Sequence, residues 1–393
     1  MGLGLCALGG GGLAAIGRTA SPRPGIGPTP EAYTREALYY ASVWSSSEAQ
    51  SSHGLGGSSP ELRNTTSHRS QYVKCQLCPR RCVIAEGQRG DCGVRENRGG
   101  KLYTLAYGNP CAVHNAPIEI KPFYHFLPGS RAYSIATAGC NLHCLYCQNW
   151  IISQRTPEQT ENRDLPPEAL VEEALREGTQ SLSFTYSEPT VFYEYMLHSA
   201  QLGRASGLYS NVVSNGYINP EPLRELCRTV DAIKVDLKAF RSGFYEKVCS
   251  ATLEPVLQTL MTIHEEGVHL EIVNLVVPTL NDGETEQRQM VRWIIKHLGA
   301  LVPLHFNRFH PQYQLTGLPC TPLATLERAR AIAMDEGMHY VYIGNVGEHP
   351  AESTYCGHCD RLIIQRRGVA VLANYIVHGK CAFCGAPIPG VWE

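Results

Sequence analysis

Cys140, Cys144 and Cys147 are separated by three and two residues and directly follow a short apolar run. Three thiolates on one loop can hold three irons of a [4Fe-4S] cube, which leaves the fourth iron without a protein ligand. Ordinary electron-transfer clusters use four cysteines and close every iron. The spacing therefore predicts a cluster with one iron open to a small molecule, and Gly139 allows the sharp backbone turn beside it. Three buried thiols, or a zinc site with a distant fourth ligand, are the alternatives.

Four further cysteines form two Cys-x2-Cys pairs near the C-terminus. Cys356 and Cys359 make the first pair, and Cys381 and Cys384 make the second. Four thiolates at this spacing suit a tetrahedral Zn²⁺ site of the zinc-ribbon type. Iron bound as in rubredoxin is the alternative. We favour zinc, and we expect it to stabilise a small separate module.

A third group, Cys75, Cys78, Cys82 and Cys92, precedes the triplet in the chain. Its spacing is less typical of a known site, and it predicts a second metal or cluster. Zinc and an auxiliary iron–sulfur cluster both remain open. The arginines around these cysteines could offset the negative charge of the thiolates, or they could form a solvated basic loop.

The composition indicates where such a protein works and which functions are excluded. Most of the 16 cysteines stand in tight pairs and triplets, which suits metal ligands better than disulfides and indicates a reducing compartment, the cytoplasm. The net charge of −2 gives no basic excess that would mark the whole chain as a nucleic-acid or membrane-surface binder. No apolar run is long enough to span a bilayer.

Short apolar runs alternate with helix-like stretches over most of the chain, which predicts parallel βαβ units. The expected strands are 132–136, 181–185, 210–214, 232–237, 270–277, 304–309 and 340–343. The expected helices between them are 167–177, 190–205, 222–227, 253–266, 284–298 and 322–336. Six units with a closing strand are too few for an eight-fold barrel, so we expect an α/β fold with a partial, open (β/α)6 barrel.

Four segments follow from this organisation. Residues 1–70, rich in Gly, Ser and Pro, are expected to be a disordered or poorly ordered extension in which only 31–44 could form a short helix. The others are an N-terminal Cys-rich module with a linking segment (71–130), the partial barrel (131–345) and the C-terminal zinc-ribbon-like module (346–393).

Polar motifs follow the expected strands, where parallel βα folds place their chemistry. TYSEPT follows the second strand, SNGY the third, VDLK ends the fourth and RFHP the sixth. Because side chains alternate along a strand, Asp236 and Lys238 of VDLK share one side, where they would pair with each other or bind a ligand. Arg308 of RFHP is a candidate for contact with a cofactor or substrate.

From about residue 36 to the C-terminus the chain resembles the radical S-adenosylmethionine (SAM) enzymes of the AmmeMemoRadiSam system, which are related to pyruvate formate-lyase activating enzymes. It departs from that family in a long Ser-rich stretch before residue 72 and in the form of HNAPIEIKP. The motifs that carry the resemblance are CQLCPRRC with GDCGVREN, KLYTLAYG, KPFYHFLPGS, the cysteine triplet with QNWIISQ, TYSEPT, SNGY, VDLK, RFHP, YIGNV and the paired C-terminal cysteines.

The resemblance implies SAM as the small molecule on the open iron. It implies that Tyr146 lies near the adenine, that Glu188 contacts the amino group of SAM, and that Ser214 faces SAM. Lys238 is the candidate for the SAM carboxylate, and Asp236 would pair with it or help to bind a cation. The structural alternative for Glu188 is a helix N-cap in which Ser187 precedes the first turn.

The function that follows is an oxidoreductase-type radical SAM enzyme that abstracts hydrogen from a substrate the sequence does not identify. A reduced flavodoxin or ferredoxin would supply the electron, and the family implies Memo-like and AMMECR-like proteins as pathway partners. Two alternatives stay open. The first is a glycyl-radical activase that acts on a partner enzyme. The second is a non-catalytic binding protein stabilised by zinc at all three cysteine groups.

Overall fold

An eight-stranded sheet forms the centre of the computed structural model, which describes residues 30–44 and 71–393. The strand order is β14-β13-β12-β11-β10-β9-β8-β7. All neighbours from β8 to β14 are parallel, and β7 (Ala112–Pro117) joins the edge antiparallel to β8. The parallel strands are β8 (Arg131–Ala136), β9 (Ser181–Phe184), β10 (Tyr209–Ser214), β11 (Ala232–Asp236), β12 (His269–Val276), β13 (Leu304–Arg308) and β14 (Val341–Gly344).

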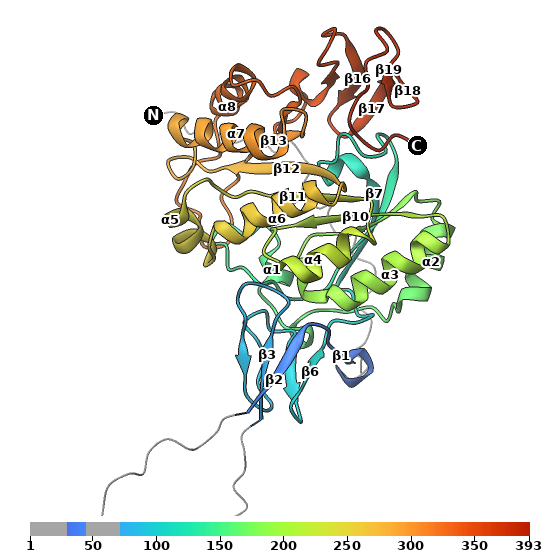
Figure 1. Cartoon of the computed structure of the whole chain (residues 1–393), viewed down its shortest axis with the longest axis vertical. Helices are drawn as coiled ribbons and strands as arrows, with labels where there is room; N and C mark the ends of the chain where they lie inside the picture. Colours follow the sequence, from blue (N-terminus) through green and yellow to red (C-terminus); the bar gives the residue numbers. More distant parts are fainter. Residues whose placement is uncertain (1–29, 45–70) are drawn as a thin grey trace, which may run out of the picture.

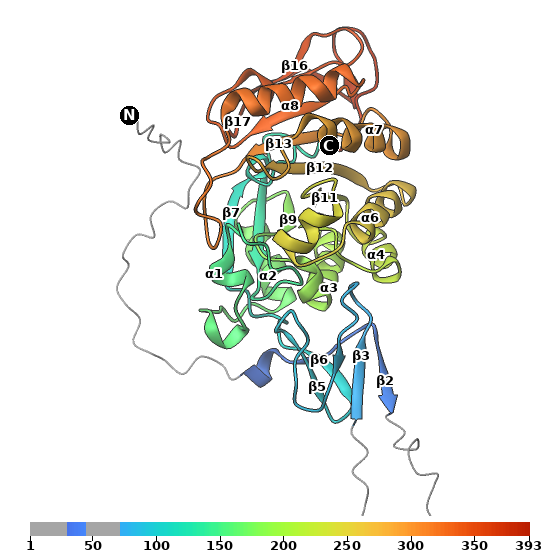
Figure 2. The same cartoon turned by 90° about the vertical axis from the view of Figure 1, so that its left-hand side faces the viewer.

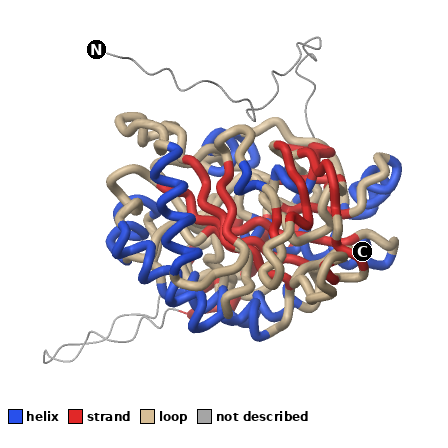
Figure 3. The backbone as a smooth tube through the Cα atoms, turned by 90° about the horizontal axis from the view of Figure 1, so that it is seen from above, coloured by secondary structure: helices blue, strands red, loops and turns tan. Residues whose placement is uncertain are grey.

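The six expected helices are present, each between two consecutive parallel strands, and Figure 3 shows them around the outside of the strands. The prediction of an α/β fold with an open barrel is confirmed, because the edge strands β14 and β7 do not pair with each other. Helix α2 illustrates how they attach, since it buries Leu170, Val171 and Ala174 on one face at helical spacing. The helices are α2 (Pro167–Arg176), α3 (Tyr193–Ala205), α4 (Pro220–Cys227), α6 (Glu254–Glu265), α7 (Glu284–Leu298) and α8 (Leu323–Asp335).

The expected helix at 31–44 is wrong. A 3-10 turn, η1 (Pro30–Tyr33), is followed by strands β1 (Arg35–Glu36) and β2 (Tyr40–Trp44). Strand β2 pairs with β3 (Gln71–Cys75) from Tyr40↔Cys75 to Trp44↔Gln71. Tertiary pairing therefore overrides a local helix preference that is weak in so short a segment. Residues 1–29 and 45–70 lie outside the described residues.

Two three-stranded antiparallel sheets form the N-terminal module. One has the order β2-β3-β4 and the other β1-β6-β5. Figures 1 and 2 place this module at one end of the barrel. The remaining strands are β4 (Val83–Ile84), β5 (Arg95–Arg98) and β6 (Lys101–Thr104).

The C-terminal module lies at the opposite end of the barrel (Figures 1 and 2). Arg366 fixes it there, because its buried guanidinium donates to the carbonyl of Tyr124 at 2.7 Å and lies 3.7 Å from Glu119. Its strands are β15 (Thr354–Tyr355), β16 (Leu362–Arg367), β17 (Ala370–Asn374), β18 (Ile376–Val377) and β19 (Lys380–Cys381). No described helix is long and apolar enough to cross a membrane.

Candidate functional site

The cysteine triplet lies on the loop that leaves β8 and precedes a single helical turn, α1 (Trp150–Ser153). Cys144 is buried, and Cys140 and Cys147 are half-buried. Two of the sulfurs have polar neighbours: the amide Nδ2 of Asn215 donates to Cys140 Sγ at 3.8 Å, and the Ser153 hydroxyl lies 3.1 Å from Cys147 Sγ. Burial raises the pKa of the Cys140 thiol well above its ordinary value, so metal binding there would release a proton.

The triplet fits a multi-iron cluster better than a single ion. Among the described residues, only the C-terminal cysteines bring three or more ligand atoms of His, Cys, Asp or Glu within 4.8 Å of one another. The three sulfurs of the triplet are therefore spread more widely than that. A tetrahedral ion with bonds of about 2.3 Å needs its sulfurs about 3.8 Å apart, whereas in a cluster each cysteine can bind a different iron.

A network around the Glu188 carboxylate connects the ends of β9 and β10. Oε1 accepts hydrogen bonds from the backbone N–H and hydroxyl of Thr190 and from the Ser214 hydroxyl, at 2.7–3.0 Å. Oε2 accepts from the backbone N–H of Asn215 at 2.8 Å. Burial raises the pKa of Glu188, and these donors oppose the rise. The side chain of the same Asn215 donates to Cys140, so a single residue connects the Glu188 carboxylate to the cysteine loop.

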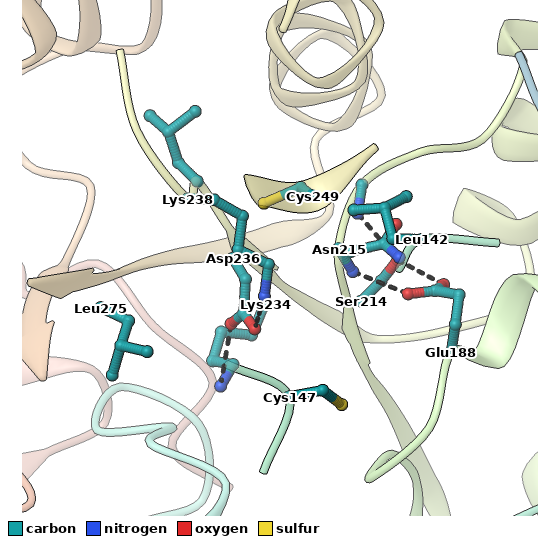
Figure 4. A network of polar contacts seen from close by, with 12 residues as sticks. Leu142, Cys147, Glu188, Ser214, Asn215, Lys234, Asp236, Lys238, Cys249 and Leu275 are labelled. Carbon is teal, nitrogen blue, oxygen red and sulfur yellow. Dashed lines mark hydrogen bonds and ion pairs between the residues drawn. The ribbon is translucent and has the colours of Figure 1, made fainter. Parts of the chain in front are cut away.

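A second network lies at the end of β11. Asp236 accepts from Lys238 Nζ at 2.8 Å, and Lys234 Nζ lies 3.5 Å from its other oxygen. Burial acts to raise the pKa of Asp236, but the two ammonium groups outweigh it and hold the pKa below its ordinary value. One carboxylate therefore faces two cations, of which Lys234 is buried and Lys238 is half-buried. Figure 4 shows the two networks on either side of the view, with Cys147 and Cys249 between them.

Sequence comparison decides the family. Residues 134–289 match the Radical SAM superfamily. The chain is 46% identical over 318 residues to an uncharacterised protein of Methanocaldococcus jannaschii, a match that covers 80% of this chain and 95% of that protein. The chain belongs to the radical SAM superfamily. This membership implies a [4Fe-4S] cluster and SAM, which the triplet fits.

Other relatives of this radical SAM protein are more distant. The pyruvate formate-lyase-activating enzyme of Clostridium pasteurianum is 22% identical over 189 residues, 47% of this chain and 76% of that enzyme. The crystal structure of a domain of the pyruvate-formate lyase-activating enzyme from Bacteroides vulgatus covers 42% of this chain and 99% of that domain. Its sequence identity is 16% and its TM-score is 0.38.

Four of the residues expected to contact SAM are joined in two pairs. Glu188 and Ser214 are hydrogen-bonded, and Asp236 and Lys238 form an ion pair as their alternation predicted. Tyr146 is buried, with its hydroxyl 3.8 Å from Cys249 Sγ. Arg308 is different, because its Nε donates to the Thr321 carbonyl at 3.0 Å rather than to either network.

One detail of the helix start is corrected. The N-cap of the 3-10 turn η4 (Pro189–Phe192), which leads into α3, is Glu188 and not Ser187. Glu188 accepts from the backbone N–H of Thr190, as a capping side chain does. The Ser187 hydroxyl is buried without a hydrogen-bond partner in the described protein.

Several polar residues inside the barrel were not predicted. Ser134, Ser183 and Asn211 are paired across β8, β9 and β10, so they share one face of the sheet. The opposite face carries Tyr133, which donates to Glu173 of α2. The first face therefore lines the interior. Within the described protein, Ser183 Oγ and Asn211 Oδ1 are buried there without hydrogen-bond partners.

Lys121 and Lys234 add positive charge to this interior. The Lys121 ammonium donates to the Tyr186 hydroxyl at 2.8 Å and lies 4.3 Å from that ring centroid. No carboxylate of the described chain lies within 4.0 Å of it. Burial lowers the pKa of Lys121 to about 7, and the Lys234 charge adds to the effect. Lys234 could have been predicted, because side chains alternate along a strand and Lys234 lies two residues before Asp236. Nothing in the sequence places Lys121 beside Tyr186.

Tyr186 is itself in an unusual conformation, since its φ of +66° lies in the left-handed region. The backbone there is held by Asn149, whose Nδ2 donates to the Tyr186 carbonyl at 2.8 Å. Strain of this kind is typical of functional sites. It turns the end of β9 so that Tyr186 meets Lys121 and Glu188 meets Ser214.

The C-terminal cysteines form the compact group mentioned above. Cys356 Sγ lies 3.7 Å from Cys384 Sγ, and Cys359 Sγ lies 3.9 Å from Cys381 Sγ. These separations match the roughly 3.8 Å expected around one tetrahedral ion with bonds of 2.3 Å. The group can therefore hold a single metal ion, and it lies at the end of the barrel opposite to the N-terminal module (Figure 1).

Proposed function

We propose that this protein binds SAM at a [4Fe-4S] cluster on Cys140, Cys144 and Cys147 and cleaves it reductively to a 5′-deoxyadenosyl radical, which abstracts hydrogen from a substrate. The observation that supports this most strongly is the loop of three buried or half-buried cysteines that Asn215 connects to the Glu188 network at the ends of parallel strands. When bound, the cluster supplies the electron that breaks the carbon–sulfur bond of SAM.

The surrounding side chains would orient SAM. Glu188 Oε2 accepts only one hydrogen bond within the described protein, so it keeps capacity for the amino group of SAM. Lys238 would attract the carboxylate of SAM, while Asp236 holds the ammonium in place. Ser214 keeps Glu188 oriented, and Tyr146 gives an apolar wall for the adenine. Arg308 stays a candidate for contact with SAM or substrate.

The motifs of the chain support a place in the AmmeMemoRadiSam system, with Memo-like and AMMECR-like proteins as pathway partners. A reduced flavodoxin or ferredoxin in the cytoplasm would donate the electron. We further propose the division into an extension (1–70), a Cys-rich module with its linking segment (71–130), a barrel (131–345) and a zinc-ribbon-like module (346–393). The similarity to the activating enzyme of Clostridium pasteurianum favours one alternative, a glycyl-radical activase of a partner enzyme.

The decisive experiment is anaerobic reconstitution with iron and sulfide, followed by dithionite and SAM and chromatography for 5′-deoxyadenosine. We expect product from the wild-type chain. The triple change of Cys140, Cys144 and Cys147 to Ala should reduce it to background, because the cluster whose open iron would bind SAM could not form. Cys227→Ala is the matched control, since Cys227 is buried on α4.

Two results would contradict the proposal. One is a well-loaded cluster at the triplet that gives no 5′-deoxyadenosine with any candidate partner protein. The other is a chain that takes up zinc but neither iron nor sulfide, which would support the non-catalytic binding protein. An electron paramagnetic resonance (EPR) signal from a glycyl radical on a partner chain would select the activase alternative.

For the C-terminal group we propose one structural Zn²⁺ ion on Cys356, Cys359, Cys381 and Cys384. The double variant Cys356→Ser, Cys381→Ser is expected to lose one zinc per chain and to unfold at lower temperature, because a closed four-sulfur site contributes directly to folding. Elemental analysis and thermal unfolding test this. Cys111→Ser serves as the control. Iron in place of zinc in the wild-type protein would contradict the assignment.

A further inference from the structure

The four N-terminal cysteines surround one small cavity. Cys75 ends β3, Cys78 and Cys82 lie in the turn before β4, and Cys92 lies in the loop before β5. The described walls of the cavity also contain Leu77, Ile84, Val191 and Thr190, together with Arg80, Arg95, Gly90 and Asn141. Strand pairing and turns thus bring together cysteines that are up to seventeen positions apart in the sequence.

The sulfurs of this group are less tightly clustered than those of the C-terminal cysteines. No three of them lie within 4.8 Å of one another, although all four residues are described. The C-terminal cysteines of the same chain do meet that condition, with sulfurs 3.7 and 3.9 Å apart. The N-terminal group therefore resembles the triplet, whose sulfurs are also spread. We propose that Cys75, Cys78, Cys82 and Cys92 hold a second iron–sulfur cluster rather than zinc.

This second site is packed directly on the loop of the first. A Cβ atom at Gly139 would lie 2.7 Å from the carbonyl oxygen of Cys92 and 2.8 Å from a methyl group of Val94. The chain before Cys140 can therefore touch the chain at Cys92 only because residue 139 is glycine. Its φ of +97° is also one that other residues rarely adopt.

Arg80 makes the second connection between the two sites. Its Nε donates to the carbonyl of Asn141 at 2.9 Å, and Asn141 follows Cys140 in the triplet loop. Both residues also line the N-terminal cavity. The two cysteine groups are thus joined through Gly139 on one side and Arg80 on the other, with no intervening layer of protein between the two loops.

The guanidinium groups in the wall suit an anionic cluster. Arg80 and Arg95 line the cavity, where Arg80 also pairs with Asp91 and Arg95 with Glu194, and their positive charge favours a negatively charged group there. In this arrangement a low-potential one-electron donor, such as a reduced flavin or iron–sulfur protein, would reduce the second cluster, which then passes that one electron to the cluster at the triplet. The electron transfer rests on the proposed function, whereas the metal site itself does not.

The test uses the full chain, reconstituted anaerobically, with iron, sulfide and zinc measured per chain. The triple Ala variant of Cys140, Cys144 and Cys147 is expected to keep iron and sulfide and to give a cluster EPR signal after dithionite. Adding Cys78→Ala and Cys82→Ala to it should remove both. The same two changes in the otherwise wild-type chain should leave the triplet cluster in place.

If the variants at Cys78 and Cys82 fail to fold, the metal content of the triple Ala variant still tests the second cluster, because its N-terminal cysteines are unchanged. A triple Ala variant that holds two zinc ions and no iron would overturn it. In the wild-type protein, dithionite is expected to give EPR lines broadened by interaction between two clusters, and the absence of broadening would overturn the electron contact. Failure to form 5′-deoxyadenosine with both clusters loaded would contradict the proposed function alone.

Discussion

Replacing Arg95 by methionine is expected to lower the free energy of unfolding by about 3–5 kcal/mol. Arg95 lies on β5 of the N-terminal module and is 2% exposed, and its partner Glu194, on α3 of the barrel, is 6% exposed. One guanidinium nitrogen donates to both carboxylate oxygens at 2.7 Å. Removing the arginine leaves a buried carboxylate without its cation. An unpaired buried charge of this kind is strongly destabilising.

The same pair also fixes the β1–β2 segment. Arg95 donates to the Leu38 carbonyl at 3.2 Å, and Glu194 accepts from the Leu38 backbone N–H at 2.8 Å. We therefore expect the N-terminal module to loosen from the barrel in Arg95→Met, which limited proteolysis near residue 38 would detect. Loss of contact at the Cys92 loop should follow.

A double-mutant cycle separates charge from packing. Arg95→Met with Glu194→Leu should recover most of the stability, because no buried charge is left alone. Arg163→Met is the matched control. Its ion pair with Glu173 is half exposed, and we expect a change below about 1 kcal/mol. Chemical denaturation at equal metal content is the measurement. A double variant as unstable as Arg95→Met would show that the arginine stem, not its charge, matters.

The barrel could be predicted from the sequence because its elements follow simple periods. The expected helix at 284–298 has the bounds of α7, and every expected parallel strand is present within a residue or two. Strand β7 was missed because AVHNAP contains a proline and little β-branched character. The stretch 31–44 was misassigned because its partner, β3, follows only after residue 70.

The parts of the candidate site that could be predicted are those whose residues lie close together in the sequence. The cysteine triplet is a single loop, and the pairing of Asp236 with Lys238 follows from strand alternation. The family resemblance placed Glu188 and Ser214 each toward SAM, whereas the hydrogen bond between them was not predicted and forms where the ends of adjacent parallel strands meet. Lys121 could not be found in this way, because it reaches Tyr186 from a segment that precedes the barrel in the chain.

Lys121→Met is expected to stabilise the folded protein below neutral pH. The pKa of Lys121 is lowered from 10.5 to about 7, which corresponds to about 5 kcal/mol. The unfolded chain keeps the ordinary pKa. Between pH 7 and about 10 it therefore binds the proton that the folded lysine has lost, and wild-type stability rises with pH. Below pH 7 the buried lysine is charged in both states and imposes its full cost.

The difference in unfolding free energy between variant and wild type should thus be largest near pH 6 and decline as the pH approaches 10. Lys296→Met, on the exposed face of α7, is the matched control for the loss of a lysine that is not buried. A buried charge that costs stability is typical of a functional site. We therefore expect Lys121→Met still to form 5′-deoxyadenosine when no substrate is present, but to convert the substrate more slowly than the wild type. A variant that is no more stable than wild type at pH 6 would mean that the fold already compensates the charge of Lys121.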